Sequence, residues 1–190
     1  MPTTTVGPVN WTLEDLVDAE RNGESLEFIL FWGHTPPSSG EIGPHVFSQW
    51  WKQDFEEDGV TYPTAEHFIM AEKARLFDDE DALAKILGSD SPKDAKAAGR
   101  GVRGFDTDTW EQHRFDIVRR ASLAKFGSDE SMRSYLLSTD KMVIVEASPN
   151  DSIWGIGAGR DDPSCKKPSQ WQGLNLLGFA LMQARAVLRN

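Results

Sequence analysis

The sequence predicts a mostly helical α+β fold in a single domain. Its 190 residues suit one hydrophobic core, and no repeat or long linker divides them. Runs of β-forming residues are few and short, whereas helix caps and glycine stops bracket most of the chain after residue 63. A few strands beside many helices are typical of the α+β class.

The N-terminal part of the chain predicts one short helix and one strand. The stretch Thr12–Asp15 is a capping box that opens the helix, and Gly23 ends it. The run LEFILFW, residues 26–32, is rich in β-forming residues and indicates a buried strand. We then expect two paired strands over residues 47–55 and 60–62, joined by an Asp-Gly turn.

Helices dominate the rest of the chain. The proline after Ser91 stands in the first-turn position that proline favours, and Gly127 stops the longest helix. We expect one further strand, over Lys141–Ala147, before a glycine-rich stretch. The expected helices cover residues 64–77, 81–87, 92–99, 108–126, 129–137 with Ser128 as its cap, and 174–188.

Charge and hydropathy exclude several classes of protein. The net charge is −10, and a chain this acidic is a poor candidate for sequence-independent binding to DNA. Residues 91–190 nevertheless carry more bases than acids, which allows a local basic pocket for a small anion. No apolar run is long enough to span a membrane, and the N-terminal MPTTTVGPVN lacks the pattern of a signal peptide. We expect a soluble, cytoplasmic protein with no membrane partner.

Cysteine and histidine usage gives no sign of a metal site. The single Cys165 excludes an intramolecular disulfide and, in its polar loop, is predicted to be an exposed thiol. The four histidines are scattered, and the chain has neither a His-Glu-x-x-His motif nor paired cysteines. There is also no Gly-x-Ser-x-Gly elbow and no P-loop. We expect no metal and no cofactor.

The sharpest local signal lies in the helix expected over residues 64–77. At about 100° per residue, Glu66 and Lys73 fall in the middle of the apolar stripe. Ionisable side chains belong on a core-facing stripe only if they are paired or functional. The opposite, solvent-facing side is expected to collect His67, Ala71, Glu72 and Arg75.

Two interpretations of Glu66 and Lys73 remain open. In the structural one they form a buried ion pair across two turns, about 10 Å along the helix axis, although paired charges are usually four residues apart. In the functional one both project into a pocket, where burial shifts their pKa values. A raised pKa suits Glu66 to acid–base catalysis, and a lowered pKa suits Lys73 to nucleophilic attack on a sugar aldehyde carbon.

A second signal follows the strand expected over residues 141–147. The glycine-rich stretch Ser148–Arg160 is a turn in which the backbone can approach a ligand closely. Within it Asp151 supplies a carboxylate, Trp154 a stacking face and Arg160 a partner for a phosphate. The alternative is a surface turn around a buried tryptophan. The Gly-x-Gly-x-Gly spacing is not the dinucleotide fingerprint.

A series of short motifs, in order, resembles the NADAR (YbiA-like) family. The resemblance runs from residue 28 to residue 188. We therefore expect residues 1–25 to be an N-terminal extension with a short helix and residues 26–190 to be the family's domain. The motifs are Phe31–Gly33, Phe47–Trp50, Asp58-Gly59, Tyr62–His67, Lys73-Ala74, Ala98–Arg100, Trp110, Lys125-Phe126, Glu146–Asp151, Trp154–Gly157 and Trp171–Gly178.

The resemblance implies a compact, mostly helical α+β fold and hydrolysis of N-glycosidic bonds. Two substrate classes are associated with the family: phosphorylated ribosylaminopyrimidine intermediates of riboflavin synthesis, and ADP-ribose attached to guanine. The resemblance matches Glu66 and Lys73 to the family's active site, Asp151 and Trp154 to its Asp-x-x-Trp-Gly-x-Gly motif, and Asn175 to its closing Trp-x-Gly-x-Asn motif. Many members carry Leu-Ser-Asn-Phe where this chain has Phe-Ser-Gln-Trp, so Gln49 points to a different substrate preference.

The two signals and the resemblance combine into a hypothesis for the reaction. Unprotonated Lys73 adds to C1′ of the ribosylamine and forms a transient Schiff base, while Glu66 moves the protons. The alternative is direct attack by water, with Glu66 or Asp151 as the base. The partner is a small nucleotide-like substrate, free or as ADP-ribosylated nucleic acid. Trp32, Trp110 or Trp154 would stack on the base, Arg100 and Arg160 would hold the phosphate, and Gly33, Gln49, Gly155, Gly157 and Asn175 would line the site.

Two other classes of function remain open. A non-catalytic module that binds NAD or ADP-ribose would keep the glycine turn and the aromatic residues but would tolerate loss of Glu66 or Lys73. A purely structural or interaction domain would give no reason for charged residues on the apolar stripe of a helix.

Overall fold

The computed structural model describes residues 11–189, so the N-terminal decapeptide that was inspected for a signal peptide lies outside the described residues. No described helix is long and apolar enough to cross a membrane. The strands are β1 (Phe28–Phe31), β2 (Phe55–Glu57), β3 (Val60–Tyr62) and β4 (Val143–Glu146). The helices are α1 (Leu13–Arg21), α2 (Ala65–Leu76), α3 (Glu80–Leu87), α4 (Pro92–Arg100), α5 (Thr107–Gly127), α6 (Glu130–Ser138) and α7 (Leu176–Leu188), with 3-10 helices at Pro44–Phe47, Pro163–Lys166 and Pro168–Gln170.

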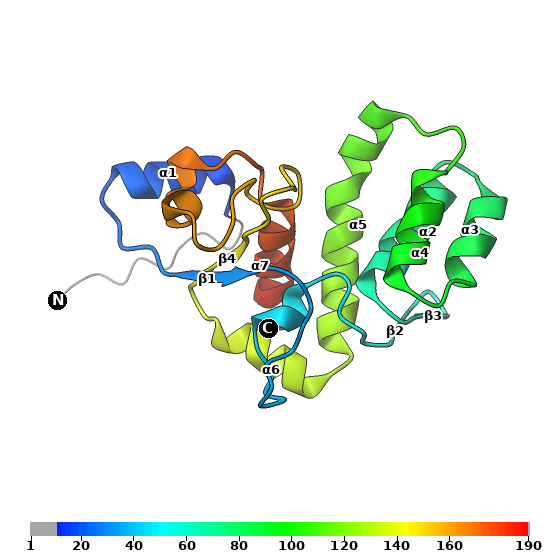
Figure 1. The fold of residues 1–190 in the computed structure, drawn as a ribbon, viewed down its shortest axis with the longest axis horizontal. Coiled ribbons are helices and arrows are strands. Elements are labelled where there is room, and N and C mark those ends of the chain that lie inside the picture. The colour runs from blue at the N-terminus through cyan, green and yellow to red at the C-terminus, as the bar shows by residue number, and fades with distance from the viewer. Residues whose placement is uncertain (1–10, 190) are drawn as a thin grey trace.

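Helix α5 stands at the centre of the molecule, between two groups of elements (Figure 1). Helices α2, α3 and α4 pack together on one side of α5, with the β2–β3 hairpin near one end of the group. On the other side, α7 packs along α5, and the β1–β4 pair packs against α7. The hydrophobic core therefore extends on both sides of α5.

The pairing of the strands brings distant parts of the chain together. Strands β1 and β4 run parallel, in a register from Phe28 opposite Val143 to Phe31 opposite Glu146. Both strands therefore end at the same edge, where the segments after residues 31 and 146 lie side by side. Strands β2 and β3 form an antiparallel hairpin whose turn residues, Asp58 and Gly59, both have positive φ.

The predicted fold class, α+β and mostly helical, is confirmed. The capping box at Thr12 is present, because its hydroxyl accepts a hydrogen bond from the Asp15 N–H at 3.1 Å. Thr64 and Ser91 cap α2 and α4 in the same way. Side-chain caps of this kind are local signals, which is why helix ends were readable from the sequence.

The strand expected over residues 47–55 was wrong for most of its length. Pro44 instead starts a 3-10 helix that ends at Phe47, and the strand is confined to Phe55–Glu57. The Ser48 hydroxyl then accepts a hydrogen bond from the Trp50 N–H at 3.2 Å, which makes a turn of the next residues. Phe47 is buried in the 3-10 helix and Trp50 and Trp51 are half-buried in the turn, whereas Phe55 is buried in β2.

Two smaller expectations also failed. Asp129, and not Ser128, caps α6, since its Oδ1 accepts a hydrogen bond from the Met132 N–H at 2.8 Å. Cys165 is buried and not exposed, and its thiol lies 3.5 Å from the carbonyl oxygen of Arg160. The indole of Trp171 donates to the Cys165 carbonyl, so the loop around the thiol folds onto the core.

Helix α2 is buried on nearly all sides, which corrects the expectation of a solvent-facing side. His67 and Ala71 are both buried, because α3, α4 and α5 pack around the helix. The ring of His67 lies 2.7 Å from the Thr64 hydroxyl and 3.2 Å from the Ser89 carbonyl oxygen, so it is a structural residue. Burial lowers the pKa of His67.

Helix α1 packs into the same core as the rest of the chain. Leu16 is fully buried there, and the Glu20 carboxylate accepts hydrogen bonds from the N–H and the hydroxyl of Ser169 at 2.9 and 3.1 Å. The boundary placed between residues 25 and 26 stays a prediction.

Candidate active site

The candidate site lies where the parallel strands end. Asn175 fixes this end of β4: its Oδ1 accepts a hydrogen bond from the Glu146 N–H at 3.0 Å, and its Nδ2 donates to the Ile144 carbonyl at 2.9 Å. Asn175 has a φ of +51° and is fully buried, so both ends of its amide serve the strand. Its contacts thus position Glu146, and a contact between Asn175 and the substrate stays a prediction.

The glycine-rich segment folds back onto the end of β4. The Ile156 N–H donates to the Glu146 carbonyl at 3.0 Å. A Cβ on Gly155 would lie 2.8 Å from that same carbonyl oxygen, so only glycine fits there. Gly157 adopts a φ of +70° and presses against Gln172. The backbone conformation and the packing therefore account for both glycines without a ligand.

Asp151 is held at the start of this segment. Its Oδ1 accepts hydrogen bonds from the N–H groups of Ile153 and Trp154 at 2.9 and 2.8 Å. The backbone turn that these bonds fix leaves Trp154 half-buried against the core. Asp151 therefore stands near the end of β4 with one oxygen engaged.

Glu66 comes to the same place from the first turn of α2. Its side chain is only 3% exposed, although it is a carboxyl group. Its Oε2 accepts a hydrogen bond from the Trp50 indole N–H at 3.2 Å, and its Oε1 lies 3.8 Å from the Lys96 ammonium of α4. Its backbone N–H donates to the Gln49 carbonyl at 3.0 Å. Burial raises the pKa of Glu66, and Lys96 opposes this rise only in part.

Glu146 provides a second perturbed carboxyl group. Burial, and then the nearby charges of Asp151 and Glu66, raise the pKa of Glu146 to about 8. Its Oε2 is buried and has no hydrogen-bond partner, and the same is true of Gln49 Nε2. Three carboxyl groups, from α2, β4 and the segment after β4, thus lie within electrostatic reach of one another, and Lys96 acts on Glu66 and Glu146.

Lys73 lies apart from this carboxyl cluster. Its ammonium donates to the Gly99 carbonyl at 2.9 Å and lies 4.2 Å from the ring centre of Phe105 and 5.7 Å from that of Trp110. Burial lowers the pKa of Lys73. In the described part of the chain Glu66 pairs with Lys96 and not with Lys73, so the buried ion pair considered in the sequence analysis is absent. Met70, between them on α2, packs against Gly99.

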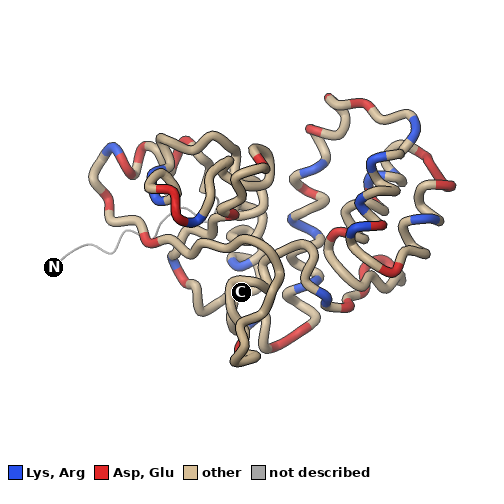
Figure 2. The backbone as a smooth tube through the Cα atoms, in the orientation of Figure 1, with Lys and Arg blue, Asp and Glu red and all other residues tan. Residues whose placement is uncertain are grey.

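The remaining predicted residues take three kinds of position. Trp32 and Gly33 follow β1 at the same edge, where Trp32 is 61% exposed and Gly33 has a φ of +74°. Arg100 is exposed at the end of α4, and its charge acts on Glu66. Arg160 is exposed, and its guanidinium donates to the Leu30 carbonyl at 3.2 Å. Basic residues stand along α4 and α5, in the half of the chain where a basic pocket was expected (Figure 2).

Sequence reasoning missed Glu146, Lys96 and Trp50 as site residues. Glu146 ends a strand of three buried aliphatic residues, and a carboxyl group at the carboxyl end of a parallel strand is a usable signal. Lys96 stands four residues before Arg100 on one face of α4, which is a weaker signal. Nothing local distinguishes Trp50 from the other tryptophans.

Comparisons with known proteins identify the family of this chain. Residues 30–189 match the family described as the NADAR domain. The chain belongs to this family. A solved NADAR-type neighbour, the Escherichia coli protein YbiA determined by NMR, superposes with a TM-score of 0.66 at 28% identity, covering 96% of this chain and 93% of YbiA. The family expected from the short motifs is therefore confirmed.

Several NADAR relatives are named as N-glycosidases. One, from Acanthamoeba polyphaga mimivirus, is 36% identical over 167 residues, which are 85% of this chain and 96% of the relative. YbiA of Escherichia coli, also named an N-glycosidase, is 32% identical over 142 residues, 75% of this chain and 80% of its own length. A chloroplastic riboflavin biosynthesis protein of Zea mays is 37% identical over 141 residues, which are 70% of this chain but 21% of that protein. The expected enzyme class, a hydrolase of N-glycosyl compounds, is the class of the mimivirus and Escherichia coli relatives.

Proposed function

We propose that this NADAR protein hydrolyses the N-glycosidic bond between a ribose and a nitrogenous base, with Glu66 as the catalytic acid. The observation that carries the proposal is the environment of Glu66. Its buried carboxyl group has one indole N–H as a close donor, and two further carboxyl groups stand nearby. An acid with a raised pKa keeps its proton to a higher pH than an ordinary carboxyl group and can give it to a leaving base.

Glu66 would act on the leaving base. A nitrogenous base leaves the sugar readily only if a proton reaches it as the C1′–N bond breaks. The N–H of Trp50 engages Oε2 of Glu66, so Oε1 is the oxygen that carries the proton, and the Lys96 ammonium at 3.8 Å then stabilises the carboxylate that remains. The protonated base departs, and the positive charge stays on the sugar carbon.

Lys73 is the nucleophile in the first form of the mechanism. Its amine attacks C1′ as the base leaves and releases one proton to solvent. The C1′–O4′ bond then breaks as the remaining N–H proton moves to O4′, which gives the imine of the ring-opened sugar, and water hydrolyses the imine to release the sugar and restore the amine. Burial lowers the pKa of Lys73, and no carboxylate holds it as an ammonium in the described part of the chain. In the second form, water attacks C1′ directly and gives its proton to Asp151 or to the Glu66 carboxylate.

Two substrates fit the proposal. The name of the maize relative supports a phosphorylated ribosylaminopyrimidine of riboflavin synthesis, and ADP-ribose attached to guanine is the class that the family resemblance implies. Arg100, whose charge reaches Glu66, would hold a phosphate of either one. Half-buried Trp154 and Trp110 offer faces for stacking on a base. The acidic chain favours a free nucleotide over duplex DNA.

A hydrolysis assay tests the proposal. Purified protein is given ADP-ribosylated guanosine, in DNA and as a nucleotide, and the ribosylaminopyrimidine phosphate, and the release of base is followed by chromatography. We expect release from one of them, with loss of activity in Glu66→Gln. Borohydride added during turnover traps an imine on Lys73 in the first mechanism. Near-normal turnover of Lys73→Ala without a trapped adduct would instead establish attack by water.

The alternative function is a non-catalytic module that binds NAD or ADP-ribose. Such a module has no need of a buried carboxyl group with a raised pKa, and burying one lowers stability. Tight binding of ADP-ribose without release of base from any substrate would establish the alternative.

A further inference from the structure

Two residues of the candidate site each have a polar side-chain atom that is buried without a hydrogen-bond partner. Among the residues that the structure describes, the buried side-chain atoms in this condition are Gln49 Nε2, Glu146 Oε2 and Arg133 Nε. Arg133 differs from the other two, because its side chain is 42% exposed and another of its nitrogens donates to the Leu188 carbonyl at 2.9 Å. The first two belong to residues of the candidate site.

Several of the neighbouring protein groups already form hydrogen bonds. Trp50 gives its indole N–H to Glu66, Asp151 accepts two backbone N–H groups, and Asn175 uses both ends of its amide on β4. Unpaired buried donors and acceptors destabilise a fold and are rare in native proteins, so each needs an explanation. A ligand that accepts a hydrogen bond from Gln49 and pairs with the carboxyl group of Glu146 supplies one.

The carboxyl groups limit the chemistry of this ligand. Glu66, Glu146 and Asp151 are close enough to act on one another electrostatically, so a neutral ligand group disturbs them less than a phosphate or another anion would. A hydroxyl group suits Glu146 in either protonation state, because it donates to a carboxylate and accepts from a carboxylic acid. It also accepts the hydrogen bond that the amide of Gln49 offers. A sugar carries hydroxyl groups on adjacent carbons.

We propose that Glu146 and Gln49 bind the hydroxyl groups of the substrate's ribose, with Glu146 on the hydroxyl at C2′. The assignment to C2′ rests on the proposed function, in which Glu66 acts at the bond to C1′ and the group beside Glu66 meets the adjacent carbon. Hydrogen bonds to this hydroxyl strengthen in the transition states of glycosidases, as positive charge grows on C1′. The site therefore selects ribosyl over 2-deoxyribosyl N-glycosides.

Binding of two sugar phosphates to the full chain tests this selection without requiring hydrolysis. The probes are ribose 5-phosphate and 2-deoxyribose 5-phosphate, titrated by calorimetry or by NMR. We expect the wild type to bind the ribose compound about tenfold more tightly, since one hydrogen bond to an ionisable group is lost with the hydroxyl. Glu146→Leu should abolish the preference, and Glu146→Gln, which keeps a hydrogen-bonding head, should retain part of it. Glu72→Gln is the matched control, because this carboxyl group is bound by two arginines, and it should keep the full preference.

Equal or absent binding of the two sugars by the wild type would overturn the proposal, as would a preference that survives Glu146→Leu. If Glu146→Leu does not fold, Glu146→Gln and Gln49→Leu provide the test, and both should reduce the preference. A protein that prefers ribose 5-phosphate but releases no base would overturn the proposed function and not this assignment. If base is released, kcat/KM is measured for the wild type and Glu146→Gln, each with the ribosyl and the 2′-deoxyribosyl substrate. The loss caused by the substitution and the loss caused by removing the hydroxyl should be non-additive, whereas additive losses would contradict the contact.

Discussion

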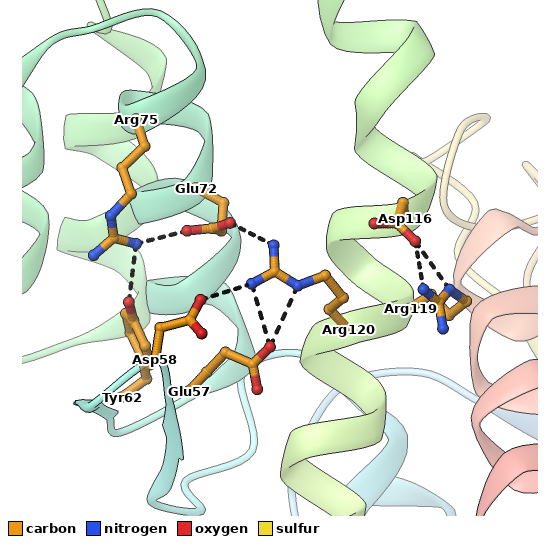
Figure 3. A network of polar contacts seen from close by, with 8 residues as sticks. All are labelled: Glu57, Asp58, Tyr62, Glu72, Arg75, Asp116, Arg119 and Arg120. Atoms are coloured by element: carbon orange, nitrogen blue, oxygen red, sulfur yellow. Dashed lines mark hydrogen bonds and ion pairs between the residues drawn. The ribbon is translucent and has the colours of Figure 1, made fainter.

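Two carboxyl groups on helix α2 have opposite surroundings. Glu72 lies in a network of complementary charges (Figure 3). One of its oxygens accepts a hydrogen bond from Arg75 and the other from Arg120, both at 2.7 Å. Arg120 also reaches Glu57 and Asp58 of the β2–β3 hairpin, and Arg75 donates to the Tyr62 hydroxyl. Every charge in the network thus has a counter-charge, and the network joins the hairpin and α2 to α5.

Glu66, less than two turns away on the same helix, is more buried and less well paired. Its side chain is 3% exposed against 16% for Glu72, yet a neutral indole at 3.2 Å is its closest side-chain donor. The comparison shows that this chain can satisfy a carboxyl group on α2 and does not do so at Glu66. Incomplete pairing in a buried position is what raises the pKa of an acid, and perturbed groups of this kind concentrate at functional sites.

The largest expected effect is that of Glu66→Gln on activity. The substitution removes the proton donor while keeping the shape of the side chain, so kcat should fall by about 10²- to 10⁴-fold. Stability should not fall, because a neutral amide is cheaper to bury than an under-paired carboxyl group. Steady-state kinetics and urea denaturation measure the two quantities. A variant with normal kcat, or one that is clearly destabilised, would make Glu66 a structural residue like Glu72.

Lys125 extends the comparison to a buried cation without any carboxylate partner. It is 1% exposed and donates to the carbonyl groups of Val46 and Ser48 at 2.6 and 2.8 Å, and burial lowers its pKa to about 7. Lys125→Met leaves both carbonyls without this donor, so it should lower the free energy of unfolding at pH 9 by about 2 kcal/mol.

The pH dependence of this loss has a definite sign. The pKa of Lys125 is lower in the folded protein than in the unfolded chain, where it is near 10.5. Between pH 7 and pH 10.5 the unfolded chain therefore binds more protons, and the contribution of Lys125 to stability grows as the pH rises. The deficit of Lys125→Met should be more than about 1 kcal/mol smaller at pH 7 than at pH 9. Arg185→Met removes another buried cation, bound to Thr139 and Met142, whose pKa of about 10 keeps it mostly charged between pH 7 and pH 9, so its deficit should change little between these values.

Glu146 should show the opposite sign. Its pKa is about 8 in the folded protein, above its value of 4.5 in the unfolded chain, so the folded protein binds more protons between these values. The contribution of Glu146 to stability is present below pH 4.5 and is lost as the pH rises through 8. Glu146→Gln should therefore be more stable than the wild type at pH 8.5, by at least about 1 kcal/mol, and nearly equal to it at pH 4.5. Parallel denaturation curves at the two pH values would contradict the burial of this carboxyl group.

The sequence predicted the helices better than the surroundings of the site. Caps such as Thr12 and Thr64 are local, so they mark helix ends without knowledge of the fold. The helical wheel picked out Glu66 correctly as a charge on an apolar stripe, but it assumed one solvent-facing side and so misplaced His67 and Ala71. A helical wheel describes one helix, whereas the burial of α2 on nearly all sides comes from its packing against α3, α4 and α5.

The carboxyl cluster itself was beyond local patterns. Glu146, Lys96 and Trp50 come from a strand, a helix and a turn that are far apart in the sequence, and only the parallel pairing of β1 with β4 and the packing of α4 on α2 bring them to Glu66. The strand expected over residues 47–55 failed for a related reason. Its apolar residues before Phe55 lie in a 3-10 helix and a turn, where Lys125, from α5, donates to the carbonyl groups of Val46 and Ser48.

The smallest expected effect is that of Glu72→Gln, which is the control for Glu66→Gln on the same helix. The variant weakens the hydrogen bonds to Arg75 and Arg120, so the free energy of unfolding should fall by about 1 kcal/mol. Sodium chloride at 1 M should reduce this loss, since salt screens partly exposed ion pairs. The value of kcat should stay within about twofold of the wild type, because the network reaches none of the groups around Glu66. A large loss of kcat without loss of stability would mean that Glu72 also contributes to activity. The two carboxyl groups of α2 would then not have separate structural and catalytic roles.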